Sequence, residues 1–497
     1  MRLLDWIVLA GYALLMLAVG AYYSRQNKSA DDYLLGGRRM SPIALGLSLF
    51  ATLVSTLSYL GTPGEMVANG PMMLTQLASH PLIFVIVGFG LIPLLMKQPV
   101  TSAYELLEKR LGTSIRLAGA SVFLLLRLGW MATILYATTD VVIVPLLKLD
   151  HTWTPWLCVA LGVITAIYSS SGGIKAVVMT DAIQSVTMLA GAILTVAVIT
   201  ADMGGVAEWW PKAWPENWQP MSWGFDPSKR VSFGMLVLST TLWYVCTNGS
   251  DQMSIQRFLS TRDAAAARRT MAIAQLTDIT VSLLLGLTGV ALLGYYRAHA
   301  SDIPSGMTIA ANGDKLFPHF IMTKMPAGLS GIVLAAILSA ALSSLSSGVN
   351  SACAVLERDF VSRGRGADTS SEAAVRRLKW LTWIIATIAV LLSLLNTLIA
   401  GNLVERSYKI VNLLTAPLFV LFFLALFVRW SNAPGAWLGL IASTATAIVI
   451  AFAEDLGINF GTKSIVWIVP SSLVVGIVVG TLASAVFHPF MRKPTES

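Results

Sequence analysis

Charged side chains are scarce in this sequence. Asp, Glu, Lys and Arg together make up 12% of its 497 residues, where a soluble globular domain carries roughly 25%. This scarcity excludes an ordinary soluble fold. In its place, apolar runs recur along the whole length, and 55% of the residues are hydrophobic. Runs of about eighteen or more apolar residues are typical of transmembrane helices, whereas a membrane β-barrel shows short alternating segments. We therefore expect an all-α polytopic membrane protein.

Cysteine and histidine are scarce as well, with three and five residues respectively. Cys158, Cys246 and Cys353 lie inside apolar segments, and the histidines show no ligand spacing. This pattern excludes a disulfide framework and a structural metal cluster. A basic leader before the first apolar run is also missing, so we expect residues 3–23 to form a span rather than a cleaved signal.

The apolar runs predict about thirteen spans. Positive charge decides their orientation, because 22 of the 34 lysines and arginines fall in one set of alternate loops and 11 in the other. Since basic loops stay in the cytoplasm, we expect an external N-terminus and a cytoplasmic C-terminus in the plasma (inner) membrane. The net charge of +8 then requires no nucleic-acid partner. The expected spans are 4–23, 42–61, 72–96, 117–146, 154–171, 178–200, 232–250, 271–296, 329–354, 379–400, 408–429, 435–453 and 464–487.

Two of these spans are interrupted by polar and glycine-rich sequence. They read SLFATLVSTLSYLGTPG over 48–64 and VLSTTLWYVCTNGSDQ over 237–252. The two lie five spans apart and therefore run in opposite directions. A matched pair of broken helices in two inverted halves is typical of a secondary transporter, because unwound backbone frees carbonyls for a cation and N–H groups for a substrate. Two glycine-kinked packing helices are the alternative interpretation.

A serine-rich stretch, SAALSSLSSGVNS over 339–351, continues an apolar helix. Ser343, Ser346 and Ser347 are spaced i, i+3 and i+4, which places them on one helix face. With a rise of about 1.5 Å per residue, Ser346 and Ser347 lie close to the depth of Asp181 on another span. A carboxylate that faces hydroxyls suits a small hard cation. Close helix packing through serine is the alternative.

Four further charged residues, Arg127, Asp140, Asp251 and Asp278, lie inside or at the end of spans, where such groups are costly and mark functional sites. Arg127 either pairs with an acid on another span or holds an anionic substrate. Asp251 ends the second interrupted helix, where it either hydrogen-bonds at the helix terminus or contacts the substrate. The sequence leaves both choices open.

Five stretches of the chain resemble the sodium:solute symporter family, which includes sodium–sugar, sodium–sialic acid, sodium–proline and sodium–monocarboxylate transporters. The resemblance implies a leucine-transporter-like core of two inverted five-helix repeats, with interrupted first and sixth core helices. The stretches are ADDYLLGGRRMSPIALGLSLFATLVSTLSYLGTPG (30–64), TSAYELLEKRLG (101–112), SSGGIKAVVMTDAIQ (170–184), LWYVCTNGSDQMSIQRFLSTRD (242–263) and GLSGIVLAAILSAALSSLSSGVNS (328–351).

This resemblance divides a single transmembrane domain, 1–497, into five parts. The external loop between the repeats is rich in tryptophan, which is typical of an interfacial aromatic belt. The parts are an extra N-terminal helix with its cytoplasmic loop (1–41), the first inverted repeat (42–201), the Trp-rich loop (202–231), the second inverted repeat (232–430), and two C-terminal helices with a short tail (431–497).

The resemblance also implies one or two co-transported sodium ions. The main site would consist of the backbone carbonyls of Ala51, Val54 and Ala340 and the hydroxyls of Ser343 and Ser344. The second site would consist of Asp181, Ser343, Ser346 and Ser347, a group that the depth comparison also assembles.

Substrate contacts are expected on both interrupted helices and near them. Trp130 stands where the bacterial sialic acid transporters place a carboxylate-binding arginine, and Arg127 lies one turn earlier. The other expected contacts are Ser55, Thr56, Ser58, Gln76, Asn248, Asp251 and Gln252.

These features predict a sodium-coupled secondary active symporter that imports a small polar organic solute, such as a sugar, a sialic acid-like compound or a small carboxylate. A sodium-responsive channel or sensor on the same fold is one alternative. A membrane-embedded serine hydrolase is another, but it needs a base beside its nucleophile, and no histidine lies near Ser343 or Ser344 in sequence. We therefore expect no enzyme. The expected partners are the solute, sodium and the lipid bilayer, without an obligatory protein partner.

Overall fold

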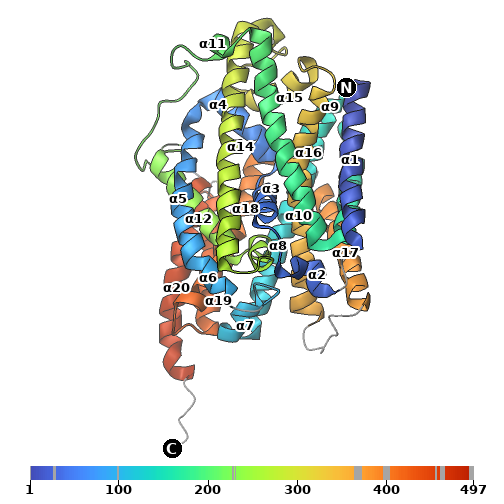
Figure 1. Ribbon diagram of the computed structural model, residues 1–497. Helices are drawn as coiled ribbons and strands as arrows, with labels where there is room; N and C mark the ends of the chain where they lie inside the picture. Colours follow the sequence, from blue (N-terminus) through green and yellow to red (C-terminus); the bar gives the residue numbers. More distant parts are fainter. Residues whose placement is uncertain are drawn as a thin grey trace, which may run out of the picture.

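The computed structural model describes residues 2–25, 29–97, 100–226, 229, 231–362, 372–395, 403–453, 456–458 and 465–491. Parts of the expected spans 379–400 and 464–487 and of the C-terminal tail lie outside these residues. The described residues form helices and loops, with no strand among them, which confirms the all-helical fold. Most of the long helices run lengthwise through one bundle (Figure 1).

Twenty α-helices make up the described bundle, and short 3₁₀ and π turns join several of them. They are α1 (Leu3–Ser24), α2 (Ala30–Leu35), α3 (Pro42–Leu53), α4 (Thr56–Asn69), α5 (His80–Val85), α6 (Ile92–Met96), α7 (Glu105–Leu111), α8 (Thr113–Tyr136), α9 (Val144–Leu147), α10 (Thr154–Met203), α11 (Val206–Trp209), α12 (Phe233–Ser250), α13 (Gln252–Leu259), α14 (Ala264–Ala298), α15 (Gly313–Thr323), α16 (Leu329–Val355), α17 (Glu372–Leu395), α18 (Leu403–Phe427), α19 (Ala433–Ala451) and α20 (Ile468–Met491).

Ten helical segments among the described residues are long and apolar enough to cross a membrane, or up to eleven if the bent pair α3 and α4 forms one span. This count is lower than the thirteen expected spans, and the difference has two sources. The expected spans 154–171 and 178–200 are merged into the single helix α10, and the 18-residue α12 is not among the apolar segments.

Helix α10 is broken internally at Gly173, whose φ of 56° and ψ of −154° are not helical. The Tyr168 hydroxyl donates to the Leu342 carbonyl, whereas the Asp181 carboxylate accepts a hydrogen bond from Ser346. Thirteen residues of straight helix would separate these two groups by about 20 Å, yet their partners on α16 are only about 6 Å apart. The chain therefore folds back at Gly173, and both halves of α10 contact α16.

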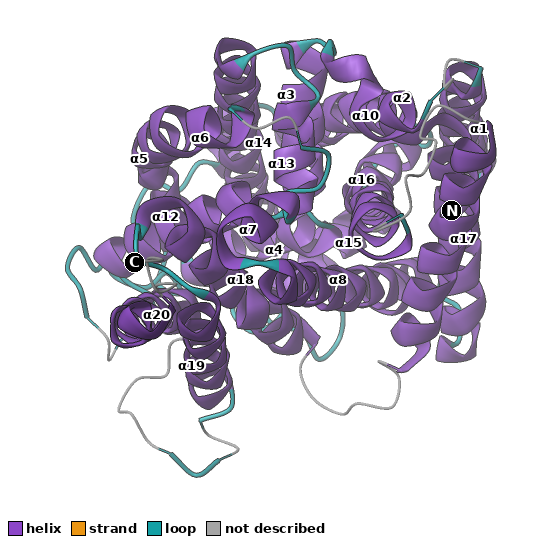
Figure 2. Cartoon of the chain, turned by 90° about the horizontal axis from the view of Figure 1, so that it is seen from below, coloured by secondary structure: helices purple, strands orange, loops and turns teal. Residues whose placement is uncertain are grey.

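Helix α16 occupies the interior of the bundle, and nearly all of its residues are buried. Seen from below, it lies inside a ring of helices, with α1 and α17 at one edge and α19 and α20 at another (Figure 2). Its first turn is capped by Asp5 of α1, which accepts hydrogen bonds from the Gly328 and Gly331 amides and from the Ser330 hydroxyl. A carboxylate at a helix N-terminus satisfies free N–H groups and complements the helix dipole.

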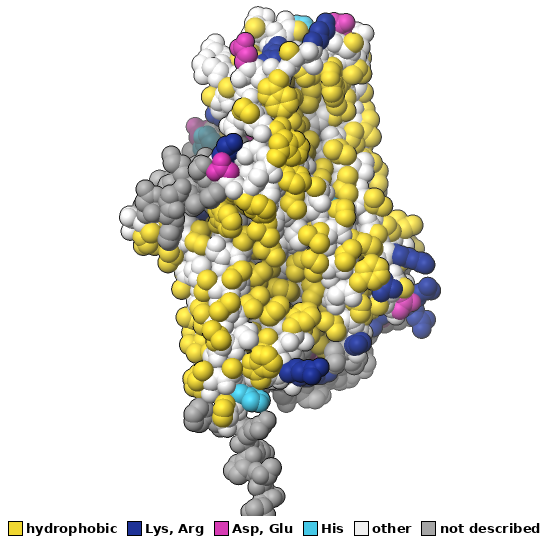
Figure 3. All heavy atoms as spheres, turned by 90° about the vertical axis from the view of Figure 1, so that its left-hand side faces the viewer, with side chains coloured by type: hydrophobic (Ala, Val, Ile, Leu, Met, Phe, Trp, Pro, Cys, Tyr) yellow, Lys and Arg dark blue, Asp and Glu magenta, His cyan; other side chains and the backbone are white. Residues whose placement is uncertain are grey.

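The outer surface of the bundle is apolar. Hydrophobic side chains cover most of the face drawn in Figure 3, and charged groups gather mainly toward its two ends. In the loop that follows α10, Trp210, Trp214 and Trp223 are exposed, whereas Trp209 and Trp218 are buried against the bundle. Such a surface is what a bilayer-embedded protein presents to lipid.

The backbone at Gly173 generates the first prediction. A Cβ there would lie 2.6 Å from the Tyr33 carbonyl oxygen, whereas Gly112, which also has a positive φ, has open space around it. Both Gly173→Ala and Gly112→Ala place a side chain on backbone with a positive φ, so the difference between their losses of stability reports the steric clash at Gly173 alone. We expect Gly173→Ala to lower the free energy of unfolding by about 1–3 kcal/mol more than Gly112→Ala does. Denaturant unfolding of the detergent-solubilised protein measures this difference. Equal losses would show that the hairpin in α10 does not depend on this close approach.

Candidate functional site

The break between α3 and α4 exposes backbone oxygen atoms inside the bundle. Val54 and Ser55 have extended backbone, and the two helix axes differ in direction by 69°. The Ser55 hydroxyl accepts a hydrogen bond from the Ser58 amide and so caps the start of α4. The last carbonyls of a helix have no partner within it. The carbonyls at the end of α3 are therefore available to other groups.

Hydroxyl groups on α16 meet these carbonyls. Ser343 Oγ lies 2.8 Å from the Ala51 oxygen, and Ser344 Oγ lies 3.1 Å from the Val54 oxygen. Ser344 Oγ also lies 3.2 Å from the Thr52 oxygen, and the Ala340 oxygen lies 3.4 Å from Ser343 Oγ. The structure thus brings together all five residues expected at the main sodium site. We call this contact between α3 and α16 the junction.

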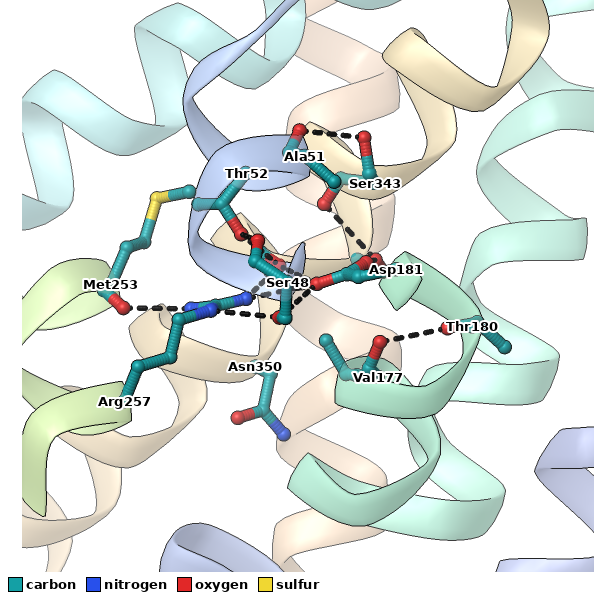
Figure 4. A network of polar contacts seen from close by, with 12 residues as sticks. Ser48, Ala51, Thr52, Val177, Thr180, Asp181, Met253, Arg257, Ser343 and Asn350 are labelled. Atoms are coloured by element: carbon teal, nitrogen blue, oxygen red, sulfur yellow. Dashed lines mark hydrogen bonds and ion pairs between the residues drawn. The ribbon is translucent and has the colours of Figure 1, made fainter. Parts of the chain in front are cut away.

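Asp181 lies next to the junction and is fully buried. Its Oδ2 atom accepts hydrogen bonds from Ser48 at 2.6 Å and from Ser347 at 2.9 Å, and its Oδ1 atom lies 3.4 Å from Ser346 Oγ. Figure 4 shows this carboxylate between α3, the second half of α10 and α16. Two of the three serines expected around Asp181 are therefore in contact with it.

The third serine, Ser343, lies elsewhere. Its hydroxyl donates to Ala51, and its only link to the Asp181 group among the described contacts runs through its carbonyl, which accepts the Ser346 hydroxyl at 3.1 Å. In this conformation the Ser343 side chain contacts the junction and not Asp181, and its place at both sites stays a prediction. Its hydroxyl has a single proton, which it donates to the Ala51 carbonyl at 2.8 Å.

Arg257 of α13 is the residue that the sequence did not reveal. Its Nη2 lies 3.0 Å from Asp181 Oδ2, its Nε lies 2.8 Å from Ser48 Oγ, and both charged side chains have no exposed surface. Its guanidinium also donates to Ser347 and to the Met253 carbonyl. A tethered cation therefore already neutralises the carboxylate expected to hold a second sodium ion.

The residues expected to contact the substrate at the second break, between α12 and α13, form hydrogen bonds and an ion pair within the protein. Asp251 is extended between α12 and α13, caps α13 through the Met253 amide and forms a buried ion pair with Arg127. Of the two roles left open for Arg127, pairing with an acid is the one present here. The Gln252 amide accepts from Ala103 N–H and donates to the Thr101 carbonyl. In this conformation these groups hold helices together, and their contact with a solute stays a prediction.

The remaining expected contacts are spread along the core. Thr56 donates to the Ile337 carbonyl on α16, and Gln76 Oε1 lies 3.4 Å from the Thr240 hydroxyl. Ser58 is hydrogen-bonded to Ser55, and Trp130 packs against the apolar core. The structure therefore does not gather them into one cluster.

A cavity lies on the side of α3 toward α12 and α14. Its lining includes Phe50, Leu53 and Val54 from the first broken helix, Tyr244 and Asn248 from α12, and Asp278 from α14. Of the nine expected substrate contacts, Asn248 is the one that lines this cavity. Val54 belongs both to the cavity wall and to the junction. The unwound segment thus lies between the oxygen atoms of the junction and a small, partly open cavity.

The chemistry of the junction suits an alkali or alkaline-earth cation, because carbonyl and hydroxyl oxygens are hard ligands. Among the described residues, no group of three or more His, Cys, Asp or Glu side chains could hold a metal ion. The described site is therefore a set of neutral carbonyl and hydroxyl oxygens rather than a carboxylate-rich or thiolate centre.

Comparison with known proteins agrees with this chemistry. The model of the sodium:solute symporter family matches residues 33–443. The sodium/sialic acid symporter SiaT of Proteus mirabilis is 29% identical over 98% of this chain and 96% of its own length. The symporter NanT of Aliivibrio fischeri is 30% identical over 92% and 89%. Human sodium-coupled monocarboxylate transporter 1 is 27% identical over 91% of this chain and 74% of its own.

Solved structures show the same relationship. A Na⁺-coupled sialic acid symporter in a substrate-bound outward-open state superimposes with a TM-score of 0.82 at 26% identity, covering 98% of both chains. Mhp1, a nucleobase-cation-symport-1 family transporter, shares the fold with a TM-score of 0.58 at 14% identity. The chain belongs to the sodium:solute symporter family. It is a sodium-coupled symporter, and sodium is its co-transported ion.

The buried pair generates the second prediction. Asp181→Asn leaves the guanidinium of Arg257 without a counter-charge, which should cost about 3–5 kcal/mol of stability, and adding Arg257→Met should recover a large part of that loss. The measurement is denaturant unfolding in detergent. The exposed Lys324–Asp302 pair provides the control, since Asp302→Asn should have a much smaller effect. A double variant no more stable than Asp181→Asn would contradict a direct pairing.

Proposed function

We propose that this protein imports a small polar organic solute together with sodium, and that the transported ion binds at the junction. The ligands are the carbonyls of Ala51, Val54 and Ala340 and the hydroxyls of Ser343 and Ser344. The observation that carries the proposal is the direct contact of a serine pair on α16 with backbone oxygens freed at the α3 break. The names of relatives that carry sialic acid or monocarboxylates support an organic solute. A sugar is also a small polar organic solute and stays within the proposal.

The geometry suggests how the ion promotes transport. An ion held between α3 and α16 draws the two helices together, because its ligands come from both. Opening toward the cytoplasm requires these helices to separate, which breaks up the ligand set and releases the ion. The membrane potential contributes about 2.3 kcal/mol per elementary charge per 100 mV. Each additional sodium ion therefore steepens the accumulation that the transporter can sustain.

A second sodium ion is proposed at Asp181, Ser346 and Ser347, in exchange with Arg257. The guanidinium already occupies the carboxylate in this conformation. A sodium ion can bind there only when Arg257 moves away, so this ion is expected to be weaker than the one at the junction. The exchange keeps the buried carboxylate neutralised in both states, which avoids the large cost of an unpaired buried charge.

The membrane arrangement is part of the same proposal. Thirteen spans follow if α3 and α4 form one span, if α10 forms two spans that meet at Gly173, and if α12 is also a span. The inverted repeats would then be residues 42–201 and 232–430. The excess of basic residues in alternate loops supports an external N-terminus and a cytoplasmic C-terminus in the plasma membrane.

Removal of one junction hydroxyl is the third prediction. Ser343→Ala should lower the apparent sodium affinity about tenfold, because it deletes a ligand in a dry site. Sodium-gradient-driven solute uptake into proteoliposomes measures the effect. Ser351→Ala is the matched control, since the Ser351 hydroxyl bonds only to carbonyls of its own helix among the described contacts. If the two variants behave alike, the transported ion does not bind at the junction.

The number of ions is the subject of the fourth prediction. In the double variant Asp181→Asn with Arg257→Met, the sodium Hill coefficient should fall to about one, from a wild-type value between about one and two. The double variant is preferred because it leaves no unpaired buried charge. Uptake measured over a range of sodium concentrations gives the coefficient. An unchanged wild-type-like coefficient above one would place the second ion somewhere other than Asp181.

A further inference from the structure

A second polar cluster lies across α3 from the junction. Asp278 of α14 is hydrogen-bonded to His80 at the start of α5 and to Tyr244 of α12. Its Oδ2 atom lies 2.9 Å from His80 Nε2 and accepts the Tyr244 hydroxyl at 2.8 Å. His80 is buried, and Asp278 has 15% of its side chain exposed. The sequence offered no partner for this histidine.

Both ring nitrogens of His80 have polar partners. Its Nδ1 lies 3.1 Å from the Leu77 carbonyl oxygen, and its Nε2 faces the Asp278 carboxyl group. The Oδ2 atom of Asp278 therefore has two hydrogen-bond partners, His80 and Tyr244. Its Oδ1 atom has one distant contact, the Ser282 hydroxyl at 3.5 Å.

Asn248 provides a second unused acceptor. Its Nδ2 donates to the Tyr244 carbonyl at 2.8 Å, which fixes the orientation of the amide. Its Oδ1 atom is buried and has no hydrogen-bond donor among the described residues. An unpaired buried acceptor is destabilising, and such an atom in a native structure calls for an explanation such as a ligand or a bound water.

Both acceptors belong to residues that line the same cavity beside Val54. The described lining contains one carboxylate, Asp278, and no lysine or arginine. Arg127, which the sequence left open as a group that holds an anionic substrate, is not among the lining residues and is already paired with Asp251. A carboxylate group placed against this wall would face the Asp278 carboxyl group, with no lysine or arginine in the described lining to pair with it.

We propose, building on the sodium-coupled import described above, that Asp278 and Asn248 form the solute-reading wall of the cavity and bind a hydrogen-bond-donating group, a hydroxyl or an ammonium. His80 and Tyr244 position Asp278 by occupying its other oxygen. A solute that carries a carboxylate must direct that group away from this wall. Solutes that lack a donor at this point leave Asn248 Oδ1 unpaired and Asp278 Oδ1 with only the long Ser282 contact, and they are discriminated against for that reason.

The test compares solutes that differ only in this group. Sodium-driven uptake into proteoliposomes is measured for three matched series. They are a sugar and its deoxy analogues, a 2-hydroxy acid and its unsubstituted parent, and the corresponding 2-amino acid and the same parent. In the wild type, the hydroxyl or amino member of the transported series should be preferred by at least about tenfold. Equal transport of the unsubstituted member would overturn the proposal.

Variants then identify the wall. Asp278→Asn should weaken a hydroxyl solute about tenfold and an ammonium solute about a hundredfold, because the latter also loses an ionic contact. Asn248→Ala should reduce the preference for the donor-bearing solute as well. Both variants should keep the sodium dependence of the junction. Asp302→Asn removes a carboxylate that pairs with Lys324. It should change neither the solute preference nor the sodium dependence.

Two failures are distinguishable. If uptake is stimulated by sodium but neither Asp278→Asn nor Asn248→Ala changes the solute preference, the solute-reading wall is wrong. Sodium-coupled import would remain intact in that case. Absence of any sodium-stimulated uptake by the wild-type protein, over all three series, would overturn both proposals. If Asp278→Asn does not fold, which thermal unfolding in detergent would show, Asn248→Ala decides the question by itself, since it removes one acceptor and no charge.

Discussion

The contact between unwound backbone at Val54 and the serine face of α16 is the interaction on which the rest of the structure depends. A helix that ends inside a bilayer leaves carbonyls that water cannot satisfy, and each unsatisfied group costs several kcal/mol. Here α16 supplies the hydroxyls that pair with them. That pairing requires α16 to run through the centre of the bundle with small side chains, which is why almost all of Leu329–Val355 is buried. Asp5 fixes one end of this helix, and the Gln256–Asn350 contact holds it near the other.

Buried ion pairs form a second layer of constraint around this contact. Arg257 pairs with Asp181, Arg127 with Asp251, and Arg116 with Asp359 at 2.6 Å. Each pair joins segments that are distant in sequence, and each would be expensive to break without a replacement charge. Apolar packing alone would allow neighbouring helices to slide in small steps. Buried charges with discrete partners instead favour a small number of defined arrangements, which is what a transporter that alternates between two states requires.

The sequence predicted one group from periodicity and depth, namely Asp181 with Ser343, Ser346 and Ser347. The pairing of Ala51 and Val54 with the serines of α16 came from the family resemblance. Arg257 could not be found in this way, because a single arginine near the end of a span is indistinguishable from an interfacial loop charge. Asp251 and Gln252 were expected to bind solute, since an interrupted helix exposes polar groups; the structure shows that capping and loop contacts use them first. His80 and Asp278 belong to different spans, and only three-dimensional packing brings them together.

The unwound segment also explains how ion and solute can be coupled without a long pathway. Val54 offers its carbonyl to Ser344 on one side and lines the solute cavity on the other, together with Phe50 and Leu53. An ion bound at the junction would therefore fix the position of one cavity wall. Coupling of this kind is reciprocal in equilibrium binding: if sodium raises solute affinity by some factor, the solute raises sodium affinity by the same factor. One residue shared by two sites is sufficient to produce that linkage, so under the proposed function the break in α3 would couple the two ligands as well as supply oxygens to one of them.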